Sequence, residues 1–527
     1  MRPRLHALGL AMALALAAFA TTPAPAQRDR NVMVGAFDVG PMGQQGNFNP
    51  LIATAGFTWL NMYFETLVLY DAKLETISGA LAQSFEVSPD KTRYSFKLAP
   101  GVKWHDGKPF TAADVKFTIE TAKDPKTASV FASRLADVSG IETPDDLTVV
   151  LTLSRPNASL LDVLTKLMIL PKHALEGIPR ETLAKDPWWS TAPIGTGPFV
   201  FVRYETDQYV ELKANPDYRK GAPKLAGVIN RYFKNTAGAV AALKAGEIQA
   251  SYVEPDDART FAGQEGFRII EGDSYVLNYI GFNHTTPLWK DERVRRAVML
   301  AINRDAIVKS LYGGAATVAN CGYVAPRLVP SDIDPYAYDP AKAKQLLQEA
   351  GWDQINGGKP LTFLTYYNSP QAANVMAAMQ AMLAQVGINV VPKQVDAATY
   401  NSIVYAKEPD SSQYPLVYAG IQDGPDPGSI NVALSSKQIP PAGGNIARVD
   451  MPDVTNALDA ALAEADADKR VQRFQDVCRV MNKELPWATM WVGKRYGVAV
   501  TSIADFVWLP APTGGGYAAN AQAWAFK

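Results

Sequence analysis

Cysteine is scarce in this 527-residue chain, and the opposite charges nearly cancel. Two cysteines cannot form a disulfide scaffold or a cysteine-rich zinc site. The balance of 51 basic and 52 acidic residues argues against a long phosphate-binding surface, and so against nucleic acid as the main partner. After residue 26, no apolar run reaches the roughly 18 residues that a membrane-spanning helix needs. An apolar fraction of 47% is that of an ordinary globular protein, and the length predicts about three to four domain-sized units.

Recognisable reaction motifs are also missing from the sequence. It has no phosphate-binding loop, no dinucleotide-binding glycine pattern, no nucleophile elbow and no His-Glu-x-x-His. After residue 26 the histidines are His105, His173 and His284, and none has a second metal-binding residue at ligand spacing. We therefore expect no cofactor and no metal site built by the protein itself. These absences favour a binding protein over an enzyme.

The N-terminus has the pattern of a cleaved secretory signal. Arg2 and Arg4 precede the uncharged apolar run 7–20, and a small-x-small triplet occupies 24–26. This order is typical of a signal peptide, so we predict removal of residues 1–26 and a mature protein that is free in the periplasm, not embedded in a membrane. In that oxidising compartment, either Cys321 and Cys478 pair, or Cys478 is a thiol in the core of a helix.

Strand and helix patterns alternate along the rest of the chain without an internal repeat, which predicts a mixed α/β fold. The strand–helix–strand unit over 361–395 favours two parallel strands joined by a crossover. Alternation of apolar and polar residues predicts strands at 94–98 and 147–153, and strand-like runs predict further strands at 199–204, 209–213, 361–367 and 388–395. Helical spacing and capping residues predict helices after Thr111, after Asn235 or Thr236, and over 292–310, 340–350, 370–386 and 469–485.

Several blocks of residues follow one another in a specific order over nearly the whole mature chain. The longest is 81–116, which contains Gly101-Val-Lys-Trp-His-Asp-Gly-Lys-Pro-Phe-Thr-Ala-Ala-Asp-Val115. The others are 195–199, 215–218, 242–248, 282–283, 294–304 and 341–352. In content and order these blocks resemble the family 5 extracellular solute-binding proteins, which are the dipeptide-, oligopeptide- and nickel-binding components of ABC importers.

The resemblance implies a two-lobed periplasmic-binding-protein-like α/β fold of the large peptide-binding type, with an extra domain inserted in the first lobe. The expected limits are residues 27–76, 191–272 and 498–527 for lobe I, 77–190 for the extra domain and 273–497 for lobe II. The implied function is capture of a small peptide or peptide-like solute by lobe closure, and its delivery to the permease. The implied partners are this ligand and the transmembrane subunits of an ABC permease, and the protein itself is expected to be a monomer.

The resemblance also implies ligand-binding residues. Asp423 matches the aspartate that pairs with the α-ammonium of a bound peptide in this family, and Asp426 matches the turn that follows. Both aspartates could instead simply cap a Gly/Pro-rich turn. Gly420 stands where peptide binders often carry an aromatic residue, so a pocket wall is missing or comes from elsewhere, for instance from Tyr418. The further candidates that border the ligand are His284 and Asn47.

Two alternatives remain open at this point. The same scaffold could bind a non-peptide solute, such as an opine, a sugar, an organic acid or a metal chelate held by an arginine and His284. More remotely, the chain could be a secreted hydrolase on a modified binding scaffold.

Overall fold

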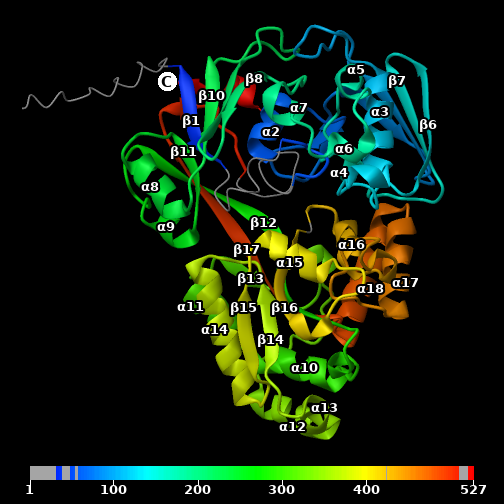
Figure 1. Ribbon diagram of the computed structural model, residues 1–527, viewed down its shortest axis with the longest axis vertical. Coiled ribbons are helices and arrows are strands. Elements are labelled where there is room, and N and C mark those ends of the chain that lie inside the picture. The colour runs from blue at the N-terminus through cyan, green and yellow to red at the C-terminus, as the bar shows by residue number, and fades with distance from the viewer. Residues whose placement is uncertain (1–30, 38–47, 54–56, 423, 510–519) are drawn as a thin grey trace, which may run out of the picture.

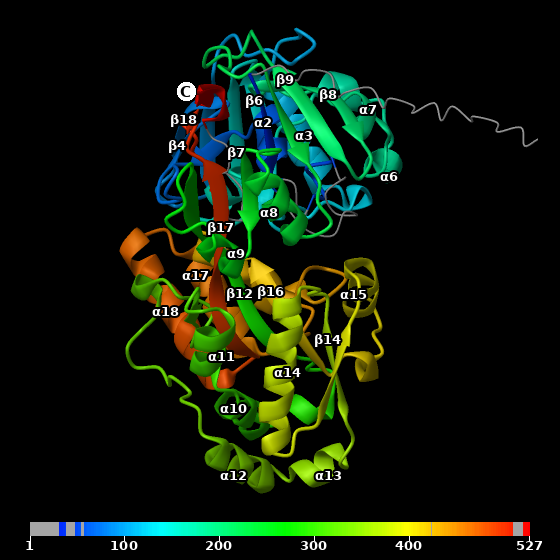
Figure 2. The same cartoon turned by 90° about the vertical axis from the view of Figure 1, so that its left-hand side faces the viewer.

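The protein forms two lobes that lie one above the other, with the chain passing between them (Figure 1). The computed structural model describes residues 31–37, 48–53, 57–422, 424–509 and 520–527. Two long strands connect the lobes, β12 (Phe267–Phe282) and β17 (Trp487–Val500), and Figure 2 shows both crossing between them. They pair antiparallel, so that one sheet runs through both lobes in the order β15-β14-β16-β12-β17-β11-β1-β10-β9-β8.

Lobe I places apolar side chains on both faces of its part of this sheet. One face packs on α8 and α9, and the other belongs to a larger core that also contains α2. The strands of this sheet are β1 (Val32–Ala36), β8 (Phe199–Glu205), β9 (Tyr209–Ala214), β10 (Gly227–Arg231) and β11 (Ala250–Val253). Two small antiparallel pairs lie outside it: β2 (Val68–Tyr70) pairs with β3 (Ile77–Gly79), and β18 (Ile503–Ala504) pairs with β19 (Ala525–Phe526). The helices are α2 (Phe57–Tyr63), α8 (Thr236–Lys244), α9 (Pro255–Arg259) and the 3₁₀ turn η7 (Ala521–Ala523).

The extra domain is a separate antiparallel sheet with its strands in the order β4-β5-β7-β6. Its buried side chains belong to the same hydrophobic cluster as those of lobe I, so the two share one continuous core. The strands are β4 (Ala82–Val87), β5 (Arg93–Leu98), β6 (Val138–Asp145) and β7 (Thr148–Leu153). The helices are α3 (Ala112–Lys123), η1 (Pro125–Thr127), α4 (Leu160–Leu164), α5 (Lys172–Leu175), α6 (Arg180–Leu183) and α7 (Trp188–Thr191).

Lobe II covers both faces of its part of the sheet with helices, and a hydrophobic cluster lies on each face. The strands are β13 (Ala316–Val318), β14 (Leu361–Thr365), β15 (Val390–Gln394) and β16 (Leu416–Gln422). The α-helices are α10 (Glu292–Ala301), α11 (Arg304–Leu311), α12 (Pro340–Ala350), α13 (Trp352–Asn356), α14 (Pro370–Gln385), α15 (Ala397–Val404), α16 (Asn431–Leu434), α17 (Pro452–Ala463) and α18 (Ala467–Glu484). The 3₁₀ turns are η2 (Pro287–Trp289), η3 (Pro326–Leu328), η4 (Ser411–Gln413), η5 (Pro427–Ile430) and η6 (Ser436–Gln438). In the described part of the chain, no helix combines the length and apolar character needed to cross a membrane.

Most elements form where the sequence predicts them. The predicted crossover unit is confirmed, because β14 and β15 pair in parallel and α14 joins them. The single helix predicted over 292–310 is wrong, since the chain forms α10 and α11 with a break between them. Asn303 causes the break by capping α11, where its side chain accepts a hydrogen bond from the backbone N–H of Ala306 at 2.9 Å. The limits predicted for the lobes and the extra domain stay predictions, although β4 to β7 all lie within 77–190.

The two cysteines form a disulfide within lobe II. Cys321 and Cys478 are bonded, and they lie 157 positions apart in the sequence. Both lie in the hydrophobic cluster on the α17–α18 side of the sheet. The crosslink therefore fixes α18 to the segment that follows β13, and it restrains lobe II alone.

Two half-buried histidines are held in the neutral state. Burial lowers the pKa of His105 and of His284 to about 4. The Nδ1 atom of His105 accepts the backbone N–H of Gly195 at 3.2 Å, while Nε2 lies 3.0 Å from the carbonyl oxygen of Gly197. His105 thus joins the residue blocks around 105 and 195 through a ring that has one donor and one acceptor. A proton added to Nδ1 would remove that acceptor.

We expect the free energy of unfolding to fall as the pH decreases from about 6.5 to 5. The unfolded chain takes up protons on these imidazoles at their ordinary pKa of about 6.5, whereas the folded chain does so only near 4. Urea unfolding at a series of pH values measures this slope. The variant His284→Gln should show a shallower slope than the wild type, and an unchanged slope would contradict the assignment.

Candidate functional site

The pairing of β12 with β17 is interrupted where the two strands pass from lobe to lobe. Asp273 opposes Lys494 and Leu277 opposes Val492, so a step of four residues on β12 matches a step of two on β17. Inside this bulge Tyr275 has a φ of 51°, a left-handed value that is uncommon for a residue other than glycine. Because a bulge bends a strand and increases its local twist, the backbone changes direction at the junction of the lobes.

Strand β11 of lobe I and the adjoining part of β17 bring an acidic and a basic side chain to this junction. Tyr252 and Glu254 lie two residues apart at the end of β11, so their side chains share one face. The guanidinium of Arg495, on β17, lies over the ring of Tyr252 at 5.3 Å from its centroid. Burial raises the pKa of Glu254 above its ordinary value, and the positive charge of Arg495 and a hydrogen bond with Tyr252 only partly offset this.

Lobe II brings tyrosines to the same place. Tyr366 and Tyr367 follow β14, with their rings 4.7 Å apart, and Tyr312 follows α11. The hydroxyl of Tyr367 donates a hydrogen bond to Oδ1 of Asn278 at 3.1 Å. Burial raises the pKa of each of these three tyrosines, although their side chains are only half-buried.

The groups from the two lobes lie within electrostatic reach of one another. The positive charge of Arg495 acts on Tyr366 and opposes the effect of burial on its pKa. The negative charge of Glu254 acts on Tyr312 and adds to the effect of burial there. The junction therefore combines both signs of charge with aromatic rings, in an arrangement suited to bind a polar solute that carries both charges. Among the described residues, no group of three or more His, Cys, Asp or Glu side chains could hold a metal ion.

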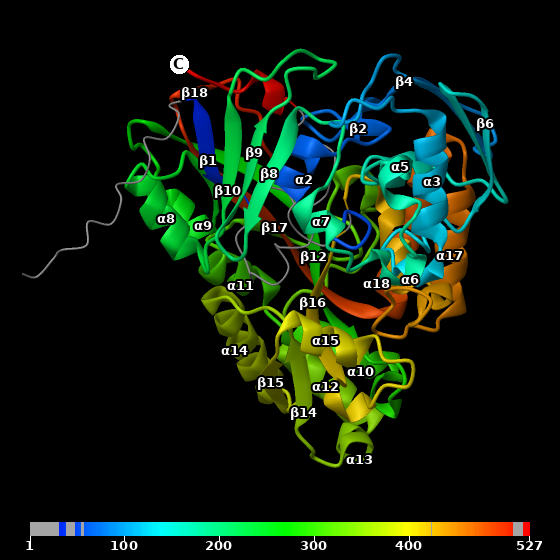
Figure 3. The same cartoon turned by 45° about the horizontal axis from the view of Figure 1, so that its top comes forward.

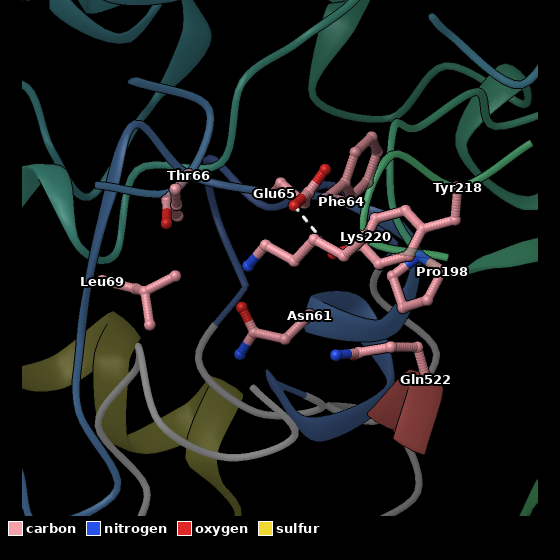
Figure 4. Close-up of a pocket in the computed structure, with 10 residues that line it drawn as sticks. Asn61, Phe64, Glu65, Thr66, Leu69, Pro198, Tyr218, Lys220 and Gln522 are labelled. Atoms are coloured by element: carbon pink, nitrogen blue, oxygen red, sulfur yellow. Dashed lines mark hydrogen bonds between the residues drawn. The ribbon is translucent and has the colours of Figure 1, made fainter. Parts of the chain in front are cut away.

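A separate cavity in lobe I is too small to hold such a solute (Figure 4). Its volume is about 40 Å³, which is room for roughly three water molecules. Glu65 lies at its wall, where Oε1 accepts hydrogen bonds from Arg219 at 2.8 Å and from the hydroxyl of Tyr218 at 3.1 Å. The junction, and not this cavity, is the candidate functional site.

The family model of the bacterial extracellular solute-binding proteins, family 5, matches residues 76–439. The chain belongs to this family. A Brucella ovis protein named as an ABC transporter peptide-binding protein is 63% identical over 491 residues, which is 93% of each chain. The glutathione-binding protein GsiB of Pectobacterium atrosepticum is 30% identical over 438 residues, covering 81% of this chain and 82% of that protein.

Solved structures of family 5 proteins share the two-lobed fold. AppA of Bacillus subtilis, in complex with a nonapeptide, is 25% identical with a TM-score of 0.82, over 94% of this chain and 98% of that one. NikZ of Campylobacter jejuni, in complex with Ni(L-His), is 26% identical with a TM-score of 0.81, over 94% of this chain and 100% of that one. The fold predicted from the sequence, a two-lobed solute-binding protein of the family 5 type, is confirmed.

Two of the predicted ligand-binding residues, Asp423 and Asn47, lie outside the described residues, and their roles stay predictions. His284 lies beyond β12, at the end of the lobe II sheet away from lobe I, where its Nε2 is 2.9 Å from the carbonyl oxygen of Pro486. Tyr418 is buried in the core of lobe II, and its ring lies 5.3 Å from that of Tyr367. The structure therefore does not bring His284 to the junction, and it places Tyr418 behind a tyrosine that is there.

The missing aromatic residue at Gly420 has a replacement from another strand. A Cβ atom built on Gly420 would lie 2.2 Å from the hydroxyl oxygen of Tyr367, far inside van der Waals contact. The ring that follows β14 thus occupies the space that a side chain on β16 would need. An aromatic wall is present at the junction, and glycine is the residue that makes room for it.

Asp426 is engaged within the protein, in a contact between lobe II and the extra domain. Figure 3 shows α17 and α18 of lobe II next to the extra domain. The carboxylate of Asp426 accepts hydrogen bonds from Arg470 at 3.0 Å, from the hydroxyl of Ser159 at 2.9 Å and from the backbone N–H of Gly428 at 2.7 Å. Burial alone would raise the pKa of Asp426, but these three partners outweigh it and hold the pKa below its ordinary value. Close to this contact, Arg155 and Asp459 lie 3.5 Å apart across the same boundary.

Reasoning from the sequence did not find Tyr252, Glu254, Arg495 or the tyrosine pair 366–367. Local signals exist for some of them, since two adjacent tyrosines directly follow the strand predicted at 361 and an acid directly follows β11. Nothing near Arg495 in the sequence marks it, because its position depends on the pairing of β17 with β11 and β12.

Arg470→Met should destabilise the protein by about 3–5 kcal/mol, because it leaves the carboxylate of Asp426 buried without its cation. Arg473→Met is the matched control on the same helix, where the side chain is exposed, and should change stability by no more than about 0.5 kcal/mol. Urea unfolding at pH 7 compares the two variants. Equal effects would show that the pair with Asp426 contributes nothing specific.

Proposed function

We propose that this chain is the periplasmic substrate-binding protein of an ABC importer, and that it captures a small peptide or peptide-like solute. The observation that carries the proposal is the convergence of Glu254, Arg495 and the tyrosines from both lobes at the bulge of β12. A solute bound there contacts both lobes, so its binding favours the closed state over the open one. The permease then recognises the closed protein and receives the solute.

The related proteins support a peptide as the ligand. The Brucella ovis relative is named as peptide-binding, GsiB as glutathione-binding, and AppA was crystallised with a nonapeptide. A nickel chelate held through His284 is less well supported, because a backbone carbonyl already engages Nε2 of that ring.

The other parts of the proposal follow from the same role. Removal of residues 1–26 on export leaves a mature, monomeric protein in the periplasm. The protein itself catalyses no reaction, and the partner subunits of the importer hydrolyse ATP. The transmembrane subunits of that importer are its macromolecular partners.

A thermal-shift screen of the mature protein tests the ligand class. We expect short peptides to raise the melting temperature, because a ligand at 100 times its Kd stabilises the folded state by roughly 2.7 kcal/mol. Sugars, opines and organic acids should leave it unchanged. Mass spectrometry of small molecules released by denaturing the purified protein provides an independent check. A consistently non-peptide ligand in both experiments would refute the peptide assignment.

Asp423→Ala tests the predicted ammonium partner. We expect the variant to bind the best peptide of the screen at least ten-fold more weakly than the wild type, because a desolvated charge pair is lost. The N-acetylated form of the same peptide is the control, since it has no ammonium and should bind the wild type and the variant equally. Titration calorimetry measures all four affinities, and a loss below two-fold for the free peptide contradicts the role of Asp423.

A further inference from the structure

Arg495 is a cation held in place without a hydrogen-bonded partner among the described residues. Its guanidinium packs on the ring of Tyr252, and the side chain is half-buried. In the part of the chain that the structure describes, the guanidinium donates no hydrogen bond and has no carboxylate oxygen within 4.0 Å. Glu254 is close enough for the two charges to act on each other, but it does not form an ion pair with Arg495.

The preceding residue on the same strand lies in a different environment. Lys494, one residue earlier, forms an ion pair with Glu271 at the surface. Successive side chains of a strand point to opposite faces, so Arg495 points to the face that carries Tyr252. That face lies at the bulge between Asp273 and Leu277, where lobe I meets the tyrosines of lobe II.

We propose that Arg495 binds the carboxylate of the ligand and so makes this protein specific for peptides, or peptide-like solutes, with a free carboxyl terminus. The inference rests on the proposed function and adds the identity of one ligand group and its partner. A guanidinium presents its N–H donors in a planar fork that matches the two oxygens of a carboxylate. The cation–π contact with Tyr252 restrains the guanidinium before the ligand arrives, so less conformational entropy is lost on binding.

Glu254 gives this arrangement its selectivity. Its negative charge faces the same junction and repels a ligand that carries only a carboxylate, whereas it attracts the positive end of a zwitterion. A short peptide that presents its carboxylate to Arg495 satisfies both charges. Anionic solutes without a positive group are therefore expected to bind more weakly than peptides of the same size.

The experiment removes the carboxylate and the guanidinium separately. The probes are a mixture of tripeptides with free carboxyl termini, the same mixture with amidated termini, and the best single tripeptide from the first mixture in both forms. The proteins are the wild type, Arg495→Gln, Arg495→Lys and the matched control Lys494→Gln. Thermal shift with the mixtures and calorimetry with the single peptide report binding, and the melting temperature of each ligand-free variant reports folding.

Amidation is expected to weaken binding to the wild type by about 10- to 100-fold, the range for the loss of a hydrogen bond to a charged group. Arg495→Gln should weaken binding of the peptide with a free carboxyl terminus by a similar factor and leave binding of the amidated peptide unchanged. Arg495→Lys, which keeps the charge but loses the planar fork, should give an intermediate loss and covers the case in which Arg495→Gln does not fold. Lys494→Gln should bind as the wild type does.

The outcomes separate this inference from the proposed function. If the wild type binds free and amidated peptides equally well, or if Arg495→Gln and Arg495→Lys weaken both forms by the same factor, the carboxylate role of Arg495 is wrong while peptide binding stands. If neither mixture shifts the melting temperature of the wild type, the proposed function fails and this inference fails with it.

Discussion

The antiparallel pairing of β12 with β17 carries the backbone hydrogen bonds of one sheet from lobe I into lobe II. Because both strands are shared, neither lobe can move without changing the geometry of this ribbon. The ladder is irregular only within residues 273–279 of β12, at the bulge between Asp273 and Leu277 and again between Asn278 and Tyr279. The interruptions of the pairing therefore lie at one level of the molecule, and the charged and aromatic groups of the candidate site gather at that same level.

At the junction, a glycine on one strand leaves room for a large side chain that comes from a distant part of the sequence. Gly420 leaves room for Tyr367, whose hydroxyl then reaches Asn278 on β12. Each of these residues alone is unremarkable in its own strand. Together they place a polar aromatic surface of lobe II opposite Glu254 and Arg495, while the extra domain contacts the same lobe on one side through Ser159 and Asp426.

Sequence patterns predicted the elements whose causes are local. The strand–helix–strand unit follows from periodicity, and the helix at Ala112 from its cap, where the backbone N–H of Thr111 donates to Asp114 at 2.9 Å. The same reasoning missed the break at Asn303, because helical spacing of apolar residues continues through it. It could not find Arg495, whose neighbours come from other strands, nor decide between the two states of the cysteines, since a distance between residues 157 apart is a property of the fold.

The position of the disulfide has a consequence for how the protein can be prepared. Cys321 and Cys478 both lie in the core of lobe II, so the covalent link stiffens that lobe and imposes no limit on the angle between the two lobes. A sample made in a reducing cytoplasm would keep the intact ribbon and its freedom to bend, yet it would carry a lobe II with an unconstrained 157-residue loop. Low solubility of such a sample would then reflect a lower stability of lobe II and not a loss of lobe closure.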